Sequence, residues 1–293
     1  MELQGPSFDL GSSLTTWLKS MPGIVTELNS PFWWPTLAIA AVGAVAIVYA
    51  RSRDGLGARP LATARVGLFL RELRVDVACF LANSLLLTLM APILFWVTVA
   101  GTAPILLTAG MPSQNAGVSH TTGLVAVTAL SFVFSDFALY WSHRIFHSFE
   151  RLWRIHQLHH RPRVLTPITA FRFWPHEQAC HYIAFNFGEG IAFGIASQFM
   201  GTDVSPMKYA GVNVFLLAWA LSFSHLRHSH FPLYFPRLLS YLLISPHMHQ
   251  VHHSIDPRHH HGNFGTALAI WDWMFGTLVI PDKNERFQFG LKT

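Results

Sequence analysis

Eight histidines stand in three short clusters whose spacing suits metal ligands. In the first cluster two histidines lie four residues apart, and the other two are near copies of one pattern, His-Gln-X-His-His. Residues four apart share a face of an α-helix, so each cluster can aim several imidazoles at one point. Imidazole binds iron, zinc, copper and nickel, so the ligand type does not name the metal. The clusters are His143 and His147; His156, His159 and His160; and His249, His252 and His253.

The alternative to a metal centre is core packing, which is the usual role of a single histidine. Eight buried imidazoles without metal would each need polar partners, and any that gained a proton would repel its neighbours. His225 and His228 raise the candidates to ten, too many for one ion. A structural zinc site closes at four ligands. Two ions with five or fewer ligands each leave a position for oxygen or water, which is a catalytic arrangement.

The composition predicts an integral membrane protein. Hydrophobic residues make up 51% of the chain and charged residues 12%, and the 24 Phe and 10 Trp suit a body with aromatic belts at the membrane interfaces. The two cysteines, Cys79 and Cys180, lie in apolar stretches and imply no disulfide framework. The net charge of +5 argues for membrane topology rather than nucleic-acid binding, because basic and aromatic residues do not alternate as on an RNA-binding surface.

Apolar stretches predict the domain organisation. Residues 1–30 are expected to form an N-terminal interfacial segment without a cleaved signal peptide, and residues 31–293 a single membrane-embedded domain. Its predicted spans are 31–50, 75–100 (kinked at Pro92) and 123–141, followed by a helical hairpin of 181–200 and 208–223 and a cap of 224–293.

The distribution of arginine predicts which side carries the histidines. Six arginines lie in 51–74 and six in 144–172, whereas 101–122 has no Lys or Arg. By the positive-inside rule the arginine-rich segments, and the histidine clusters with them, face the cytoplasm. The expected fold is therefore an all-α integral membrane protein with about four to five transmembrane or re-entrant helices. A cytoplasmic helical cap is expected to hold the histidine-rich dimetal site.

The order of these motifs resembles the fatty acid hydroxylase/sterol desaturase superfamily. The resemblance covers roughly 123–277; it is most specific in the two His-Gln-X-His-His motifs and in the closing Asn-Phe-Gly…Trp-Asp…Phe-Gly-Thr of 263–277. It implies a cap over an all-histidine centre of two iron ions. Such a centre uses molecular oxygen and two electrons to hydroxylate or desaturate an unactivated C–H bond of a membrane lipid: a fatty acyl chain, a sterol or a similar molecule.

The resemblance extends to individual residues. The eight clustered histidines match the superfamily's ligands directly. The next position is looser: His228-Ser-His230-Phe-Pro fits its frame, so His228 is the first choice, His225 the second, and His230 a supporting residue. Many relatives have histidine where this chain has Trp174, which cannot ligate, so that role is lost or passes to His176.

Three further residues are predicted to support the ligands, and none beyond the ligands is predicted to be catalytic. Asp136 lies two turns before His143 on the same helix face and is expected to accept a ring N–H. Tyr140 is one turn closer, with a hydrogen bond near the centre as one interpretation and core packing as the other. Asp272, between two tryptophans, is either structural or a supporting residue.

The partners follow from what the sequence lacks. No flavin or dinucleotide glycine motif and no fused haem domain is found, so a separate ferredoxin, cytochrome or reductase is expected to supply electrons.

The rival interpretation is a non-catalytic metal transporter or a bis-histidine haem electron carrier. A haem takes one histidine from each of two helices, and transporters place ligands near the midplane, so dense triplets argue against both. Zinc is expected as a substitute for iron in purified protein. A bacterial inner membrane is favoured over the endoplasmic reticulum.

Overall fold

The structure is a computed structural model that describes residues 9–20, 66–109, 119–200, 208–209, 212–221 and 224–291. The predicted first span, 31–50, lies outside these residues. The regular structure of the described residues is helical apart from one short strand pair and two isolated bridges, which confirms the all-helical prediction. The helices are α1 Leu10–Ser20, α4 Val66–Ala109, α5 His120–Ser148, α6 Glu150–His160, α7 Pro175–Met200, α8 Val214–Leu221, α9 Pro246–His252 and α10 Ile270–Met274. The short 3-10 helices are η2 Pro167–Phe171, η3 Ser224–His228, η4 Leu239–Tyr241 and η5 Pro257–His259.

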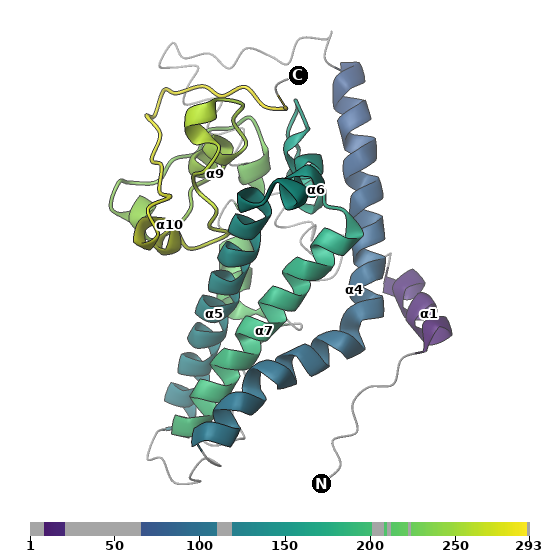
Figure 1. The fold of residues 1–293 in the computed structure, drawn as a ribbon, viewed down its shortest axis with the longest axis vertical. Helices are drawn as coiled ribbons and strands as arrows, with labels where there is room; N and C mark the ends of the chain where they lie inside the picture. Colours follow the sequence, from purple (N-terminus) through teal and green to yellow (C-terminus); the bar gives the residue numbers. More distant parts are fainter. Residues whose placement is uncertain are drawn as a thin grey trace.

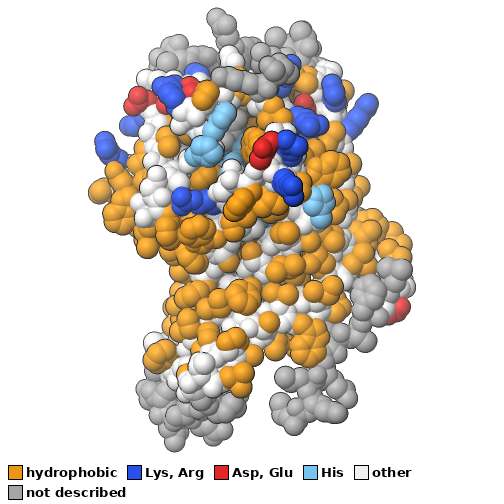
Figure 2. All heavy atoms as spheres, in the orientation of Figure 1, with side chains coloured by type: hydrophobic (Ala, Val, Ile, Leu, Met, Phe, Trp, Pro, Cys, Tyr) orange, Lys and Arg blue, Asp and Glu red, His pale blue; other side chains and the backbone are white. Residues whose placement is uncertain are grey.

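Three long helices, α4, α5 and α7, form the elongated part of the molecule; α6, α9 and α10 lie at one end of it, and α1 lies beside α4 (Figure 1). Hydrophobic side chains cover the long helices, whereas Lys and Arg side chains gather around the short ones (Figure 2). Among the described helices, α4 over Gly67–Ala109 and α5 over Thr121–Ser148 are long and apolar enough to cross a membrane, by length and composition.

Helix α4 is longer than predicted, at 44 residues, and it bends in its interior (Figure 1). It contains Pro92 and Pro104, which lack the amide hydrogen that an interior helical position donates, and such prolines are a usual cause of sharp bends. The kink predicted for this span is thus observed.

The prediction that 208–223 forms the second helical arm of a hairpin is wrong in the extent of the helix. Strands β1 Lys208–Tyr209 and β2 Val212–Asn213 pair antiparallel, and of the residues that the structure describes in this arm only the eight of α8 are helical. Asn213 explains where α8 begins: its Oδ1 accepts the N–H of Phe215 at 2.9 Å, while its Nδ2 donates to the carbonyl of Thr128 at 3.0 Å. A helix of this length rises only about 12 Å, too little to cross a bilayer.

Glycines allow α7 to approach α4 and α5 closely. A Cβ on Gly190 would lie 2.2 Å from the carbonyl oxygen of Thr98 in α4, and one on Gly188 would lie 2.5 Å from that of Phe134 in α5. Thr102 bridges the first crossing by donating to the carbonyl of Gly190 at 2.9 Å. Small residues at such contacts let helix backbones meet within an apolar environment.

Gly190→Ala is therefore expected to destabilise the protein by about 1–3 kcal/mol, because the added methyl group forces α4 and α7 apart. Gly67→Ala is the matched control, since a Cβ there meets nothing within 4 Å. We expect a lower midpoint of thermal unfolding in detergent for Gly190→Ala only. Equal midpoints for the two variants would show that the crossing is not close-packed.

Candidate metal centre

Nine histidines converge in two neighbouring clusters at the end of α5. Within each cluster, one ring nitrogen from every histidine lies within 4.8 Å of those of the others. We name these the five-histidine cluster and the four-histidine cluster. The first consists of His143, His147, His156, His160 and His252, and the second of His159, His228, His249 and His253.

Each His-Gln-X-His-His motif contributes to both clusters. In α6 the pair four residues apart, His156 and His160, belongs to the five-histidine cluster, and His159 belongs to the other. In α9 the roles are reversed: His249 and His253 belong to the four-histidine cluster, and His252 to the five-histidine cluster. The two copies of the motif therefore interlock and place the clusters side by side.

Local sequence signals set the helices that carry these residues. Phe149 is extended (φ −115°, ψ 125°), which ends α5 and lets α6 turn away from it. Ser245 accepts the N–H of Met248 at 3.2 Å and is followed by Pro246, a favourable start for α9. His228 comes from η3, which packs against α9.

Hydrogen bonds to Nδ1 fix the tautomers in the five-histidine cluster. Nδ1 of His143 lies 2.9 Å from the carbonyl oxygen of Phe264, and Nδ1 of His252 lies 3.0 Å from that of Gly262. Carbonyl oxygens only accept, so the proton is on Nδ1 and Nε2 carries a lone pair. Nδ1 of His156 contacts the carboxylate of Glu177 in the same way.

The Nε2 atoms then face one another with their lone pairs. Nε2 of His156 lies 3.2 Å from Nε2 of His143 and 3.1 Å from Nε2 of His160. The buried Nε2 atoms of His147 and His252 have no hydrogen-bond partner among the described residues. With metal–nitrogen bonds of about 2.0–2.1 Å, two ligands on one ion lie roughly 3 Å apart. The residues present thus fit a metal ion, which would remove the repulsion between the lone pairs.

The four-histidine cluster has the same close approach. Successive Nε2 distances are 3.3 Å from His159 to His228, 3.0 Å from His228 to His249 and 3.2 Å from His249 to His253. A second ion fits here. The buried Nδ1 atoms of His159, His249 and His253 find no hydrogen-bond partner in the described part of the chain.

Burial keeps these imidazoles neutral, as ligands must be. Outside the long apolar helices, it lowers the pKa of six of them well below 6.5, and neighbouring imidazoles or Arg227 lower it further. The six are His159, His160, His228, His249, His252 and His253.

Glu177, in the first turn of α7, was not predicted from the sequence. Its side chain is fully buried, contacts Nδ1 of His156 and lies 3.8 Å from Nε2 of His181, whose Nδ1 is 2.8 Å from Oγ of Ser142. Burial raises the pKa of Glu177, but the hydrogen bond from His156 and the proximity of His181 outweigh it and leave the pKa lowered. The available signal was the four-residue spacing from Glu177 to His181, which puts both on one helix face.

Asp136 does not take the partner expected for it. Its carboxylate accepts the N–H groups of Ala267 (2.9 Å) and Leu268 (3.1 Å) and the indole N–H of Trp271 (3.0 Å), rather than a histidine ring. It therefore fastens α5 to the loop before α10. The reason is that a loop folded against the helix offers several amide donors to one buried carboxylate.

Asp272 completes this loop. It accepts the N–H of Phe264 and of Gly265, each at 2.8 Å, and the hydroxyl of Thr277 at 2.6 Å. Because the carbonyl of Phe264 accepts from His143, Asp272 supports a ligand through one peptide unit. The hydroxyl of Tyr140 is 3.1 Å from that of Thr277, and its ring is buried among aromatic side chains.

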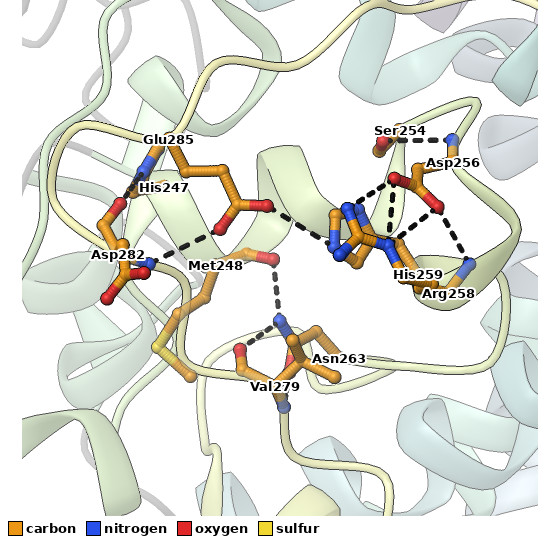
Figure 3. Close-up of polar contacts among 10 residues, drawn as sticks. All are labelled: His247, Met248, Ser254, Asp256, Arg258, His259, Asn263, Val279, Asp282 and Glu285. Carbon is orange, nitrogen blue, oxygen red and sulfur yellow. Dashed lines mark hydrogen bonds and ion pairs between the residues drawn. The ribbon is translucent and has the colours of Figure 1, made fainter.

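Asn263 anchors α9 from the other side, as Figure 3 shows. Its Nδ2 donates to the carbonyl oxygens of Met248 (2.8 Å) and Val279 (2.7 Å), and its Oδ1 accepts the N–H of Val279 at 2.8 Å. Its φ of 59° lies in the left-handed region, which asparagine tolerates better than most residues. The Asn-Phe-Gly motif thus positions α9 and the histidines that it carries.

Asn263→Ala is expected to destabilise the protein by about 2–4 kcal/mol, since it removes three hydrogen bonds of a fully buried side chain and leaves their partners unsatisfied. Asn263→Gly loses the same bonds but tolerates the positive φ, so it should be the milder variant by about 1 kcal/mol. Thermal unfolding of the two variants measures the difference. If both variants unfold like the wild type, Asn263 does not anchor α9.

Other predicted residues lie outside the two clusters. The side chain of His225 is not within the described part of the structure. Nε2 of His230 accepts the N–H of Leu165 at 3.3 Å, and its ring contacts Phe289. His176 is exposed and stacks on Trp174.

A cavity of about 540 Å³ reaches the five-histidine cluster. Three histidines of that cluster, His147, His160 and His252, line it together with Trp153 and Gln157. None of the described lining residues belongs to the four-histidine cluster. Small molecules therefore have a route to one side of the centre.

Two adjacent clusters built from histidine alone are typical of proteins that can hold a pair of metal ions. The chain belongs to the fatty acid hydroxylase family, whose sequence model matches residues 128–277. It is 30% identical over 162 residues to an alkylglycerol monooxygenase of Xenopus tropicalis, a match covering 55% of this chain and 32% of the relative. It is 29% identical over 163 residues to an ornithine lipid hydroxylase of Rhizobium tropici, covering 55% and 44%.

A Delta(7)-sterol 5(6)-desaturase of Aspergillus fumigatus is 24% identical over 164 residues, covering 54% of this chain and 42% of the relative. The matches thus span less than half the length of these relatives. No solved structure matches the chain.

Proposed function

We propose that the protein is a membrane-embedded, oxygen-dependent diiron oxygenase that hydroxylates or desaturates an unactivated C–H bond of a membrane lipid. The substrate class is a fatty acyl chain, a sterol or a similar lipid. The observation that carries the proposal is the pair of neighbouring clusters with five and four converging imidazoles. The relatives include a monooxygenase, a hydroxylase and a desaturase. Their names support oxidation of a lipid as the reaction.

The nine clustered histidines would hold two iron ions, with zinc as a substitute in purified protein. When bound, iron supplies the activation of molecular oxygen and the electron transfer that imidazoles alone cannot perform. His225 completes the proposed set of ten ligands.

The protein residues around the clusters hold the ligands ready. The carbonyls of Phe264 and Gly262 and the carboxylate of Glu177 keep protons on Nδ1, so that Nε2 points at the ion. Neutral imidazoles leave the charge of the ions uncompensated, and Glu177 offsets part of it. The cavity beside His147 and His252 gives the reactants access.

The apolar helices suggest how a lipid is presented. We infer that α4 and α5 cross the membrane, within a body of four to five spanning or re-entrant helices. The cap would then lie on the cytoplasmic side of a bacterial inner membrane, as the exposed Arg151, Arg154 and Arg161 in and next to α6 suggest. A separate ferredoxin, cytochrome or reductase would deliver electrons there. A bis-histidine haem carrier is disfavoured because ring nitrogens within 4.8 Å of one another leave no space for a macrocycle.

Lipid analysis of a host with and without the protein tests the proposal. Cells expressing the chain and an electron donor, grown under isotopically labelled oxygen, should contain either a hydroxylated lipid carrying the label or a lipid with a new double bond. An unchanged lipid profile, with the protein present in the membrane and loaded with iron, would overturn the proposed activity.

A further inference from the structure

The two histidine clusters differ in the support behind their ligands. In the five-histidine cluster, His143, His156 and His252 each direct Nδ1 at an oxygen acceptor. In the four-histidine cluster, the buried Nδ1 atoms of three ligands have no partner among the described residues; these ligands are His159, His249 and His253. A ligand histidine that donates its second N–H is held in orientation and is a stronger base toward the metal.

The two clusters also differ in nearby charge. Glu177, fully buried, contacts His156 of the five-histidine cluster and places a carboxylate one imidazole away from that site. Arg227 lies next to His228 in the sequence and its positive charge acts on His228 and His249 of the other cluster. A nearby carboxylate stabilises a bound cation, and a nearby guanidinium opposes it.

From these observations we propose that the five-histidine cluster is the tighter metal site and that Glu177 is the positioning residue that makes it so. The protein then passes through a one-metal form in which the four-histidine cluster is empty. This inference rests on the proposed function, because it assumes that both clusters bind metal.

An equilibrium titration tests the order of binding. Metal-free protein in detergent would be titrated with Co²⁺, without oxygen, against a competing chelator, and bound metal would be counted per chain. Equilibrium is needed because the cavity reaches the five-histidine cluster and would affect release rates. We expect two steps of unequal affinity. His143→Ala should weaken the tighter step selectively, and His249→Ala the weaker one.

Glu177→Gln tests the residue itself. It removes the charge while keeping the shape of the side chain, and supporting partners of ligand histidines typically contribute about 10–100-fold to metal affinity. The tighter step should weaken by about that factor, and the weaker step should not change. Glu150→Gln is the matched control: it removes an acidic residue that lines the same cavity but pairs with Arg154.

Two equal steps, or a Glu177→Gln variant with unchanged binding, would overturn the inference and leave the proposed oxygenase intact. Failure of the wild-type protein to bind two ions would instead contradict the proposed function. Circular dichroism of each variant checks that the helices have formed. The wild-type titration decides the order of binding even if a variant does not fold.

Discussion

His252→Ala is expected to abolish formation of the oxygenated or desaturated lipid. The side chain of His252 is buried, its Nδ1 is held by the carbonyl of Gly262, and its Nε2 points into the five-histidine cluster without another partner. The variant loses a ligand outright, so the loss of product should exceed the about 10–100-fold that removal of a supporting partner causes. Mass spectrometry of lipid extracts measures it.

His176→Ala is the matched control, because that histidine is exposed and stacks on Trp174, away from both clusters. It should leave the product at the wild-type level. Product formation by His252→Ala equal to that of the control would show that the five-histidine cluster does not take part in the reaction.

The metal-free protein is expected to lose stability steeply as the pH falls below about 6.5. Burial lowers the pKa of six cluster histidines in the folded state, whereas in the unfolded chain they titrate near 6.5. Below that pH the unfolded chain binds protons that the folded chain does not, so the free energy of unfolding falls as pH falls. The slope approaches about 1.4 kcal/mol per pH unit for each histidine.

Thermal unfolding of metal-free and metal-loaded protein, at about pH 8 and about pH 5.5, measures this effect. Bound ions occupy the lone pairs of the folded state but not of the unfolded chain, so the loaded protein should be more stable at both pH values and lose at least as much stability as the pH falls. Metal-free protein that is equally stable at both values would contradict the neutral, buried state of the clusters.

The convergence of the histidines could be predicted because helical spacing is a local property. His156 with His160, and His249 with His253, lie four apart, and each pair reaches one cluster. The division of each motif between two clusters could not be predicted in the same way. It depends on how α6 and α9 face each other, which no local pattern records.

Supporting residues were harder to predict, because a buried carboxylate bonds to whichever donors tertiary packing brings to it. Asp136 lies on the helix face of His143, yet it holds the backbone of Ala267 and Leu268. Glu177, far from His156 in sequence, contacts it because α7 returns alongside α5. The start of α8 likewise depends on tertiary packing, because Asn213, which precedes this helix, donates a hydrogen bond to α5.

The closing motif shows what a resemblance adds and what it omits. The residues of this motif identify the family, but their spacing in the sequence does not reveal what each of them does in the fold. In the fold, Asn263 anchors α9, and the carbonyl of Phe264 orients His143. Asp272 holds that peptide in place. The motif is therefore a scaffold for ligands that lie elsewhere in the sequence.

Counting the metal in purified protein tests the central claim most directly. Protein from iron-supplied cells should contain two non-haem transition-metal ions per chain, predominantly iron, and the double variant His143→Ala/His249→Ala should contain clearly less metal. A haem absorption band, or wild-type protein that binds one ion or none after reconstitution, would contradict the account.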